Sequence, residues 1–347
     1  MSPVLARAVS RLVERSAHFR GAPTLAPSPF KEWLHFCVMA DAVDLLVNFN
    51  LMSMQHEGQR PRPEARLVMI ARDARGWHGD VQRVPGRRAA VHPGRIDATL
   101  AGARLTFRDG AFVIRGALAD GRVAVDLTLR PVTMPLIRPN RPLFQGSLHW
   151  VVVPRLLASG TIVVGGESHP IDDAPAYHDH NWGTWRWGED FLWEWGFVLP
   201  TRPRDPWTVV FFRLLNRAHT RELGHGLMVW RDHIQYRIFR DGQLTFSSRG
   251  LLRPQGLPKF PSVMGLITPD LVCDVPEEIA VEARAGRDHL RCVLRPRDPA
   301  QILIPNETDL GATVLNETTA SAEAEGTVGG AHLSTRGRAI FEYLTGA

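Results

Sequence analysis

The chain has 347 residues, more than the ~250–300 at which a single hydrophobic core usually stops growing, so its length predicts two domains. Hydrophobic residues make up 44% and charged residues 22%, which is typical of a globular protein and excludes disordered and membrane-spanning classes. The net charge is +5, but only Lys31 and Lys259 are lysines and the arginines are scattered. Without a basic run or a nucleic-acid motif, DNA or RNA binding is not expected.

The N-terminal residues 4–19 predict one basic amphipathic helix. Their apolar residues recur at helical spacing, and arginines recur every four residues, at positions 7, 11 and 15. Such a helix either caps the protein's own fold, which is the simpler expectation, or lies as a peripheral contact on the inner face of a membrane. No apolar stretch reaches ~18 residues, so no segment is expected to span a bilayer, and the start resembles no signal peptide.

After a proline-rich linker at 21–29, the sequence reads almost entirely as strands separated by Gly, Asp, Asn and Pro. This pattern predicts an all-β protein. In the first half, strands are predicted at 33–39, 44–52, 65–71, 98–107, 111–118 and 122–131.

Several short motifs recur 160 to 166 residues later in the same order. The pairs are Glu32-Trp33 with Glu194-Trp195, 67–69 with 227–229, 129–131 with 294–296, and Gly160-Thr161 with Gly326-Thr327. Tyr177 then falls opposite Tyr343. The order predicts a duplicated antiparallel unit of the size of a β-barrel or β-sandwich domain. The predicted parts are a helix and linker (1–29), an N-terminal β domain (30–187) and a C-terminal β domain (188–347).

Residues 177–195, YHDHNWGTWRWGEDFLWEW, hold five of the ten tryptophans. This density indicates either a packed domain junction or a pocket for a large apolar ligand. If 177–182 is a strand, Tyr177, Asp179 and Asn181 share one face. His178, His180 and Trp182 share the other.

The two faces suggest different chemistries. His178 and His180 have the spacing of two metal ligands, but no third ligand or HExxH motif accompanies them, so neither a metal nor another cofactor is expected. Asp179 in an apolar cavity would have a raised pKa and could deliver a proton, with Tyr177 hydrogen-bonded to it and Asn181 orienting it. Alternatively, Asp179 and Asn181 simply satisfy backbone groups at the end of a strand.

Nucleophilic and phosphate chemistry have no support in the motifs. The chain has no GxSxG elbow, no P-loop and no GxGxxG, and Gly165-Gly166 and Gly329-Gly330 look like hairpin turns. Three cysteines are too few for a disulfide framework, have no CxxC spacing and have no recognisable catalytic context. They predict reduced, buried thiols and a cytoplasmic protein; they are Cys37, Cys273 and Cys292.

These motifs together resemble the carotenoid 1,2-hydratase (hydroxyneurosporene synthase) and AttH-like superfamily. The resemblance spans residue 31 to the C-terminus. It rests on Glu32-Trp33, on SLHW at 147–150 followed by Pro154 and Gly160, on YHDHNWG at 177–183, and on GRAIFEY at 337–343. It implies two tandem lipocalin-like β domains with an apolar cavity, and an enzyme that hydrates or cyclises polyenes. The hydratases' acid–base centre would correspond here to Tyr177, Asp179 and His149, beside Trp150.

The leading hypothesis is therefore a metal-independent lyase or isomerase. It would hydrate, isomerise or cyclise an elongated polyene, isoprenoid or polyketide by acid–base catalysis. The alternatives are a Diels–Alderase-type pericyclase, in which Asp179 is dispensable, and a non-catalytic carrier of a lipid or pigment. The residues expected to bind substrate are Trp33, Trp150, His178, Asn181, Trp182, Trp185 and Trp195. The sequence identifies neither the substrate nor the oligomeric state.

Overall fold

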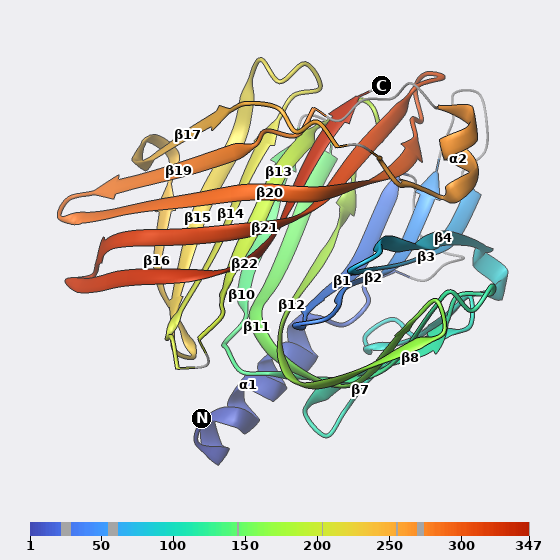
Figure 1. The fold of residues 1–347 in the computed structure, drawn as a ribbon, viewed down its shortest axis with the longest axis horizontal. Helices are drawn as coiled ribbons and strands as arrows, with labels where there is room; N and C mark the ends of the chain where they lie inside the picture. Colours follow the sequence, from blue (N-terminus) through green and yellow to red (C-terminus); the bar gives the residue numbers. More distant parts are fainter. Residues whose placement is uncertain are drawn as a thin grey trace. The chain divides into compact units, whose positions relative to one another are not determined.

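The computed structural model describes residues 1–21, 29–54, 62–143, 146–202, 204–254, 256–268 and 274–346. The chain divides into two compact units, Met1–Arg186 and Trp187–Ala347. Each unit is built on one curled, almost wholly antiparallel sheet, so the predicted all-β, lipocalin-like fold is confirmed (Figure 1). Most of the predicted linker at 21–29 lies outside the described residues, as does Cys273.

The first unit's sheet has the order β4-β3-β2-β1-β12-β11-β9-β8-β7-β6-β5, and β10 pairs with β11 outside this path. The sheet curls until β3 approaches β6 and β9, which are not its neighbours in the ladder. A short 3-10 turn covers Gly86–Arg88. The strands are β1 (Phe30–Met39), β2 (Asp44–Met54), β3 (Arg62–Asp73), β4 (Gly76–Pro85), β5 (Ala90–Val91), β6 (Asp97–Leu100), β7 (Ala103–Arg108), β8 (Ala111–Ala117), β9 (Val123–Pro131), β10 (Leu136–Leu143), β11 (Gly146–Val164) and β12 (Glu167–Thr184).

The second unit's sheet has the order β16-β15-β14-β13-β22-β21-β20-β19-β17. The two-residue strand β18 joins β20 in parallel, an exception to the antiparallel pattern. A 3-10 turn (Asp241–Gln243) and helix α2 (Ser262–Ile267) complete the unit. The strands are β13 (Leu192–Pro200), β14 (Trp207–Leu215), β15 (Glu222–Arg231), β16 (Ile234–Arg240), β17 (Leu244–Arg249), β18 (Lys259–Phe260), β19 (Glu278–Ala285), β20 (Asp288–Pro305), β21 (Ala312–Val328) and β22 (Ala331–Gly346).

The two sheet orders correspond strand for strand, from β4-β3-β2-β1-β12-β11-β9-β8 in the first unit to β16-β15-β14-β13-β22-β21-β20-β19 in the second. Every repeated sequence motif falls on a corresponding pair of strands, which supports a duplication; the domain boundaries at 30 and 188 stay predictions. The register corrects one detail. Glu32 faces Trp182 and Glu194 faces Tyr343, so Tyr343 corresponds to Trp182 and not to Tyr177.

Alternating side chains build a separate apolar core in each unit. In β1, Leu34, Phe36 and Val38 point into the core of the first unit, as period-two alternation requires. The predicted strand at 98–107 is in fact the hairpin β6–β7, because Ala101 and Gly102 turn the chain at φ +47° and +86°.

Two glycine positions set the geometry of the long hairpin β11–β12. Gly165 and Gly166 form its two-residue turn at φ +57° and +85°, the left-handed values that such turns need. Gly183, inside the YHDHNWG motif, lies so close to β11 that a Cβ would be 1.9 Å from the carbonyl oxygen of Ser147. Only glycine permits this approach of the two strands.

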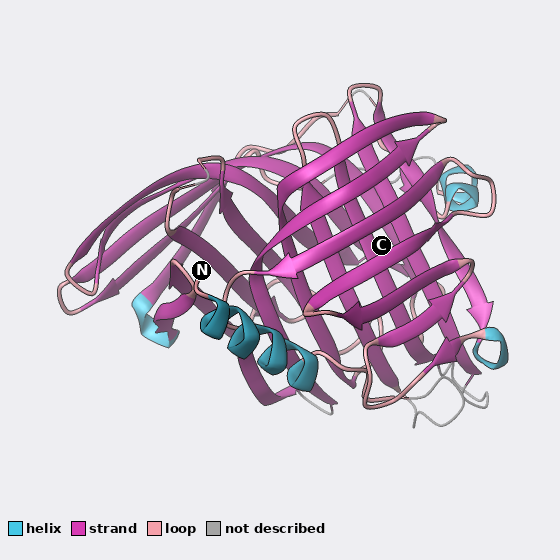
Figure 2. Ribbon diagram, turned by 90° about the horizontal axis from the view of Figure 1, so that it is seen from below, coloured by secondary structure: helices cyan, strands magenta, loops and turns pink. Residues whose placement is uncertain are grey.

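Helix α1 (Pro3–Ser16) packs on the first unit. Ser2 caps it, accepting a hydrogen bond from the Leu5 amide, and a proline occupies its first turn. Its apolar stripe, with Val9 and Val13 both fully buried, joins the core of the first unit, and the helix contacts β9. Helix α1 is the long helix in Figure 2. The helix therefore caps its own unit, and the arginines at 7, 11 and 15 are exposed. Contact with a membrane surface stays a prediction.

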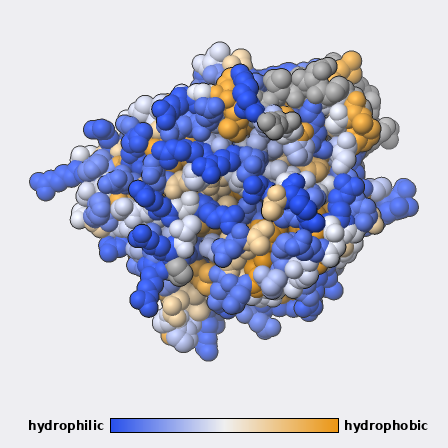
Figure 3. Space-filling model, in the orientation of Figure 1, coloured by the Kyte–Doolittle hydropathy of each residue, from blue (hydrophilic) through white to orange (hydrophobic). Residues whose placement is uncertain are grey.

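In the described part of the chain, no helix has the length and apolar character needed to cross a bilayer. Hydrophilic residues predominate on the face shown in Figure 3, with apolar ones gathered in small groups.

Substitution in α1 tests how much the helix stabilises the first unit. Val13→Ala removes two buried methyl groups and is expected to lower the free energy of unfolding by about 1–3 kcal/mol. Leu12→Ala, at a neighbouring position that is 41% exposed, is the matched control and should cost less than about 1 kcal/mol. Chemical denaturation of the full chain measures the free energy of unfolding of both variants. An equal decrease in the two would mean that burial of the apolar stripe does not stabilise the first unit.

Candidate functional site

Strand β12 carries the candidate site at the centre of the first sheet. It lies between β1 and β11, and its residues Tyr177, Asp179 and Asn181 face Cys37, His35 and Trp33 of β1 in register. On the other side, Asp179 faces Val152 and Asn181 faces Trp150 of β11. Directly opposed residues in a sheet share a face, so side chains from three strands meet around Asp179.

Three side chains donate hydrogen bonds to the Asp179 carboxylate, which is only 5% exposed. Trp150 Nε1 and Tyr177 Oη donate to Oδ2, each at 3.0 Å. Asn181 Nδ2 donates to Oδ1, also at 3.0 Å. The three donors together give both oxygens of this buried carboxyl group a hydrogen-bond partner.

Two further tryptophans, Trp33 and Trp185, lie in contact with each other near this carboxyl group. Trp33 lies opposite Asn181 in the ladder, and its ring contacts that of Trp185 edge-on, with centroids 5.3 Å apart. The backbone carbonyl of Trp185 accepts a hydrogen bond from the buried ammonium of Lys31, at 3.0 Å. Of the predicted substrate-binding residues, Trp33, Trp150 and Asn181 therefore share the face of Asp179.

His178 lies on the opposite face, inside the core of the first unit. Its ring stacks on Phe36 at 4.2 Å and contacts Phe112 at 4.5 Å, and its Nδ1 donates to the His35 carbonyl oxygen at 2.9 Å. Burial lowers the pKa of His178 well below its usual value, so the imidazole is neutral. The alternation predicted that His178 and Asp179 lie on opposite faces of the strand, and the structure shows this arrangement.

His149 and Trp182 also lie on that opposite face. They oppose each other in the β11–β12 ladder and stack at 4.9 Å, while the Arg20 guanidinium lies 4.7 Å above the Trp182 ring. Burial, and then the charge of Arg20, lower the pKa of His149. Because His149 directly precedes Trp150 in a strand, the two must point to opposite faces. The structure therefore places Trp150, and not His149, beside Asp179.

Glu32 fastens the N-terminal segment to this end of the sheet. Its fully buried carboxylate accepts hydrogen bonds from the Arg20 amide at 2.6 Å, the Gly21 amide at 2.8 Å and His180 Nε2 at 2.8 Å. The two histidines of the predicted pair therefore have different structural contacts. His178 packs in the core, and His180 forms a hydrogen bond with Glu32. Neither offers a metal site in the described residues.

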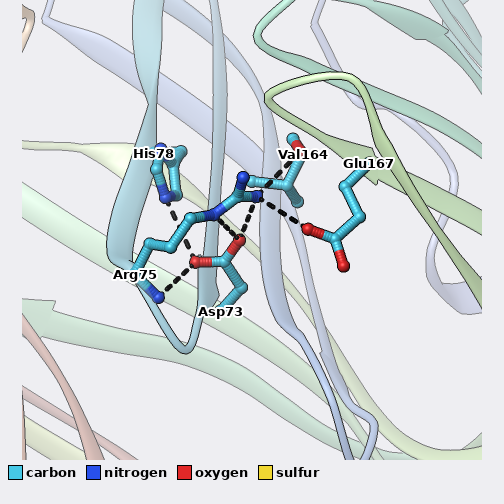
Figure 4. A network of polar contacts seen from close by, with 5 residues as sticks. All are labelled: Asp73, Arg75, His78, Val164 and Glu167. Atoms are coloured by element: carbon cyan, nitrogen blue, oxygen red, sulfur yellow. Dashed lines mark hydrogen bonds and ion pairs between the residues drawn. The ribbon is translucent and has the colours of Figure 1, made fainter.

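A different cluster brings three possible metal ligands together, Asp73, Glu167 and His169, whose ligand atoms lie within 4.8 Å of one another. Arg75 pairs with both carboxylates of this cluster. Its Nε donates to Asp73 at 2.9 Å, and its guanidinium lies 3.5 Å from the Glu167 carboxylate (Figure 4). Burial raises the pKa of Asp73, but the hydrogen bonds from Arg75 outweigh it and lower the value to about 2. These residues fit an ion-paired link between hairpins β3–β4 and β11–β12 better than a cation site.

The second unit has its own buried acidic pair, which sequence reasoning missed. Glu317 and Glu342 lie directly opposite each other in the β21–β22 ladder and are 1% and 8% exposed. Trp193 Nε1 donates to Glu342 at 2.8 Å. Burial raises the pKa of Glu342 to about 7, although hydrogen bonds from Trp193 and Glu317 partly oppose it. Trp195, a predicted substrate-binding residue, opposes Glu342 on the other side.

Known proteins match this chain in structure but not in sequence. No family model and no curated protein sequence matches it. A protein of Nitrosomonas europaea described as an AttH has a TM-score of 0.66 at 15% identity, covering 95% of this chain and 94% of that one. Kievitone hydratase of Nectria haematococca has a TM-score of 0.58 at 12% identity, with 96% and 97% covered.

CghA, solved with Sch210972, has a TM-score of 0.53 at 12% identity, covering 96% of this chain and 97% of its own. This chain has the AttH-like fold. The resemblance predicted from the motifs is confirmed at the level of the fold, because the AttH-like neighbours match over nearly the whole of both units. At identities this low, the AttH-like fold carries no residue roles with it.

The acidic pair makes the second unit's stability depend on pH. Since the folded pKa of Glu342 is raised, its contribution to stability is fully present at pH 4 and is lost as the pH rises through about 7. Between pH 4 and 8, the wild type should lose on the order of 3 kcal/mol relative to Glu342→Gln. Denaturant titrations at both pH values measure this, with Glu325→Gln, an exposed position on β21, as the control that should follow the wild type.

Proposed function

We propose that this chain is an enzyme of the lyase or isomerase type. It binds an elongated hydrophobic small molecule and transfers a proton to or from it through Asp179, thereby hydrating, isomerising or cyclising the molecule. The observation that carries this proposal is the convergence of Trp150, Tyr177 and Asn181 on one buried carboxyl group. That a structural neighbour is a hydratase supports the reaction class.

The geometry suits proton transfer to an alkene. When the acid form of Asp179 gives up its proton, the resulting carboxylate keeps three donors, and its charge is therefore stabilised without solvent. The carbocation formed on the substrate needs a π-rich or anionic environment. The indole rings of Trp33 and Trp150, on the same face of the sheet, can supply the π-rich environment. The Asp179 carboxylate itself supplies the negative charge.

Tyr177 and Asn181 act on the reaction through Asp179. By bonding different oxygens of the carboxyl group, at Oδ2 and Oδ1 respectively, they fix the plane of the group and hence the direction in which its proton leaves. We therefore treat both as positioning residues, with Trp150 as the third. The role expected for His149 passes to Trp150 in this proposal, because only Trp150 reaches the carboxyl group.

Solvent-isotope labelling tests this function. The full chain is incubated in D₂O with an acyclic polyene, and deuterium in the recovered polyene is followed by mass spectrometry. Asp179→Asn should lower the rate by at least about 100-fold, and Tyr177→Phe by about tenfold, because loss of the acid removes the proton step whereas loss of one donor only weakens it.

Asp126→Asn, at an exposed position of β9 that pairs with Arg115, is the matched control and should keep the wild-type rate. If Asp179→Asn converts the polyene as fast as the wild type does, acid–base catalysis by Asp179 is wrong, and conversion without any uptake of deuterium would favour a pericyclase. Stoichiometric recovery of unaltered polyene, with no turnover by any variant, would instead identify a carrier.

A further inference from the structure

A cysteine and a histidine lie in contact on the same face of the sheet as Asp179. Both belong to β1, two residues apart, and His35 Nε2 is 2.9 Å from Cys37 Sγ. The two side chains are buried, at 2% and 1% exposed. In the β1–β12 ladder, His35 opposes Asp179 and Cys37 opposes Tyr177. The thiol therefore adjoins the proposed proton-transfer centre.

A third residue orients the histidine. Asn48 opposes His35 in the β1–β2 ladder, and its amide Nδ2 lies 3.5 Å from His35 Nδ1. Its Oδ1 is buried and has no hydrogen-bond partner among the described residues. Turning this amide by 180° exchanges the two atoms, so that Oδ1 accepts a hydrogen bond from His35 Nδ1–H and the buried acceptor is satisfied.

The orientation of Asn48 decides what His35 can do. With its Nδ1 proton held by the Asn48 oxygen, a neutral His35 presents the lone pair of Nε2 to the thiol of Cys37. Burial lowers the pKa of His35 to about 3, so the imidazole is neutral at physiological pH and one of its ring nitrogens carries no proton. A nucleophile, a base in hydrogen-bond reach and a group that orients the base are the recognised requirements for an activated thiol.

We infer that Cys37, His35 and Asn48 form a nucleophilic thiol site for an electron-poor alkene, namely a double bond conjugated to a carbonyl group. Cys37 Sγ bonds to the β-carbon as His35 Nε2 takes the thiol proton, and His35 then returns that proton to the α-carbon. The sum is addition of S–H across the double bond, with no oxidant or reductant. The addition is reversed when the α-carbon loses its proton and the Cys37 thiolate departs, which restores the double bond.

This inference rests on the proposed function only for the kind of substrate: a polyene that carries a conjugated carbonyl group. Addition of the thiol interrupts the conjugation and holds the substrate beside Asp179 as a covalent adduct. His35 and Cys37 are then catalytic residues, whereas Asn48 is a positioning residue.

Alkylation by a small enone tests the site without any knowledge of the substrate. The folded full chain is treated with methyl vinyl ketone at pH 7, and each cysteine peptide is followed by mass spectrometry. Cys292 is an internal control, since burial, and then the charge of Glu323, raise its pKa to about 12 and its thiol stays protonated. Cys37 should react about 100-fold faster than Cys292.

Variants separate the roles of the three residues. His35→Gln should slow Cys37 alkylation to about the Cys292 rate. Asn48→Leu, which removes the acceptor, should slow it about tenfold, and Asn48→Asp, which keeps an acceptor oxygen in place, should restore it. Circular dichroism and the melting temperature confirm that each variant is folded.

Two results would overturn the inference. One is a Cys37 that reacts no faster than Cys292 in the folded wild type, and the other is a rate that His35→Gln leaves unchanged. Because the assay follows a small probe and not polyene conversion, it stands apart from the isotope experiment. A reactive Cys37 with no deuterium transfer would refute the proposed function alone, and the reverse result would refute the thiol site alone.

Discussion

The central position of β12 is the constraint on which the rest of the candidate site depends. A strand with hydrogen-bonded neighbours on both sides must present alternate residues to opposite faces, and it receives matching residues from each neighbour. In β12 this puts Tyr177, Asp179 and Asn181 among side chains from β1 and β11. The same rule commits His178 to the core and His180 to Glu32. One backbone ladder thus separates the face that carries Asp179 from a face whose side chains pack and hold the fold.

The corresponding strands of the two units carry different chemistry on a shared scaffold. Trp33 and Trp195 occupy equivalent positions, but the residue opposite each is Asn181 in the first unit and Glu342 in the second. Likewise, Trp150 is replaced by Glu317. The first unit surrounds one carboxyl group with donors that can stabilise its charge. The second opposes two carboxyl groups, which can lie together only while a proton remains between them.

The sequence was sufficient to predict the fold and the composition of the Asp179 face, because a period of two is strict and the motif residues lie within one strand. The resemblance, and not the alternation, grouped His149 with Asp179; the register places His149 on the opposite face, opposite Trp182. The His35–Cys37 pair looks like an ordinary strand, and its meaning depends on Asn48, which only the β1–β2 register brings opposite. The Glu317–Glu342 pair depends on register in the same way. Local sequence patterns do not predict which residues of different strands lie opposite each other.

The order of the strands also has consequences for the assembly of each unit. The first strand of each sheet pairs with the last long strand of its unit, β1 with β12 and β13 with β22, so the middle of each sheet is completed by residues about 150 positions apart. Loop closure over such a distance is slow. During synthesis, β1 and β2 can pair early as a hairpin, but the inner edge of β1 stays open until β12 leaves the ribosome. Until then the backbone N–H and C=O groups along that edge are unpaired, so the nascent chain can aggregate at the strand that will later lie beside Asp179.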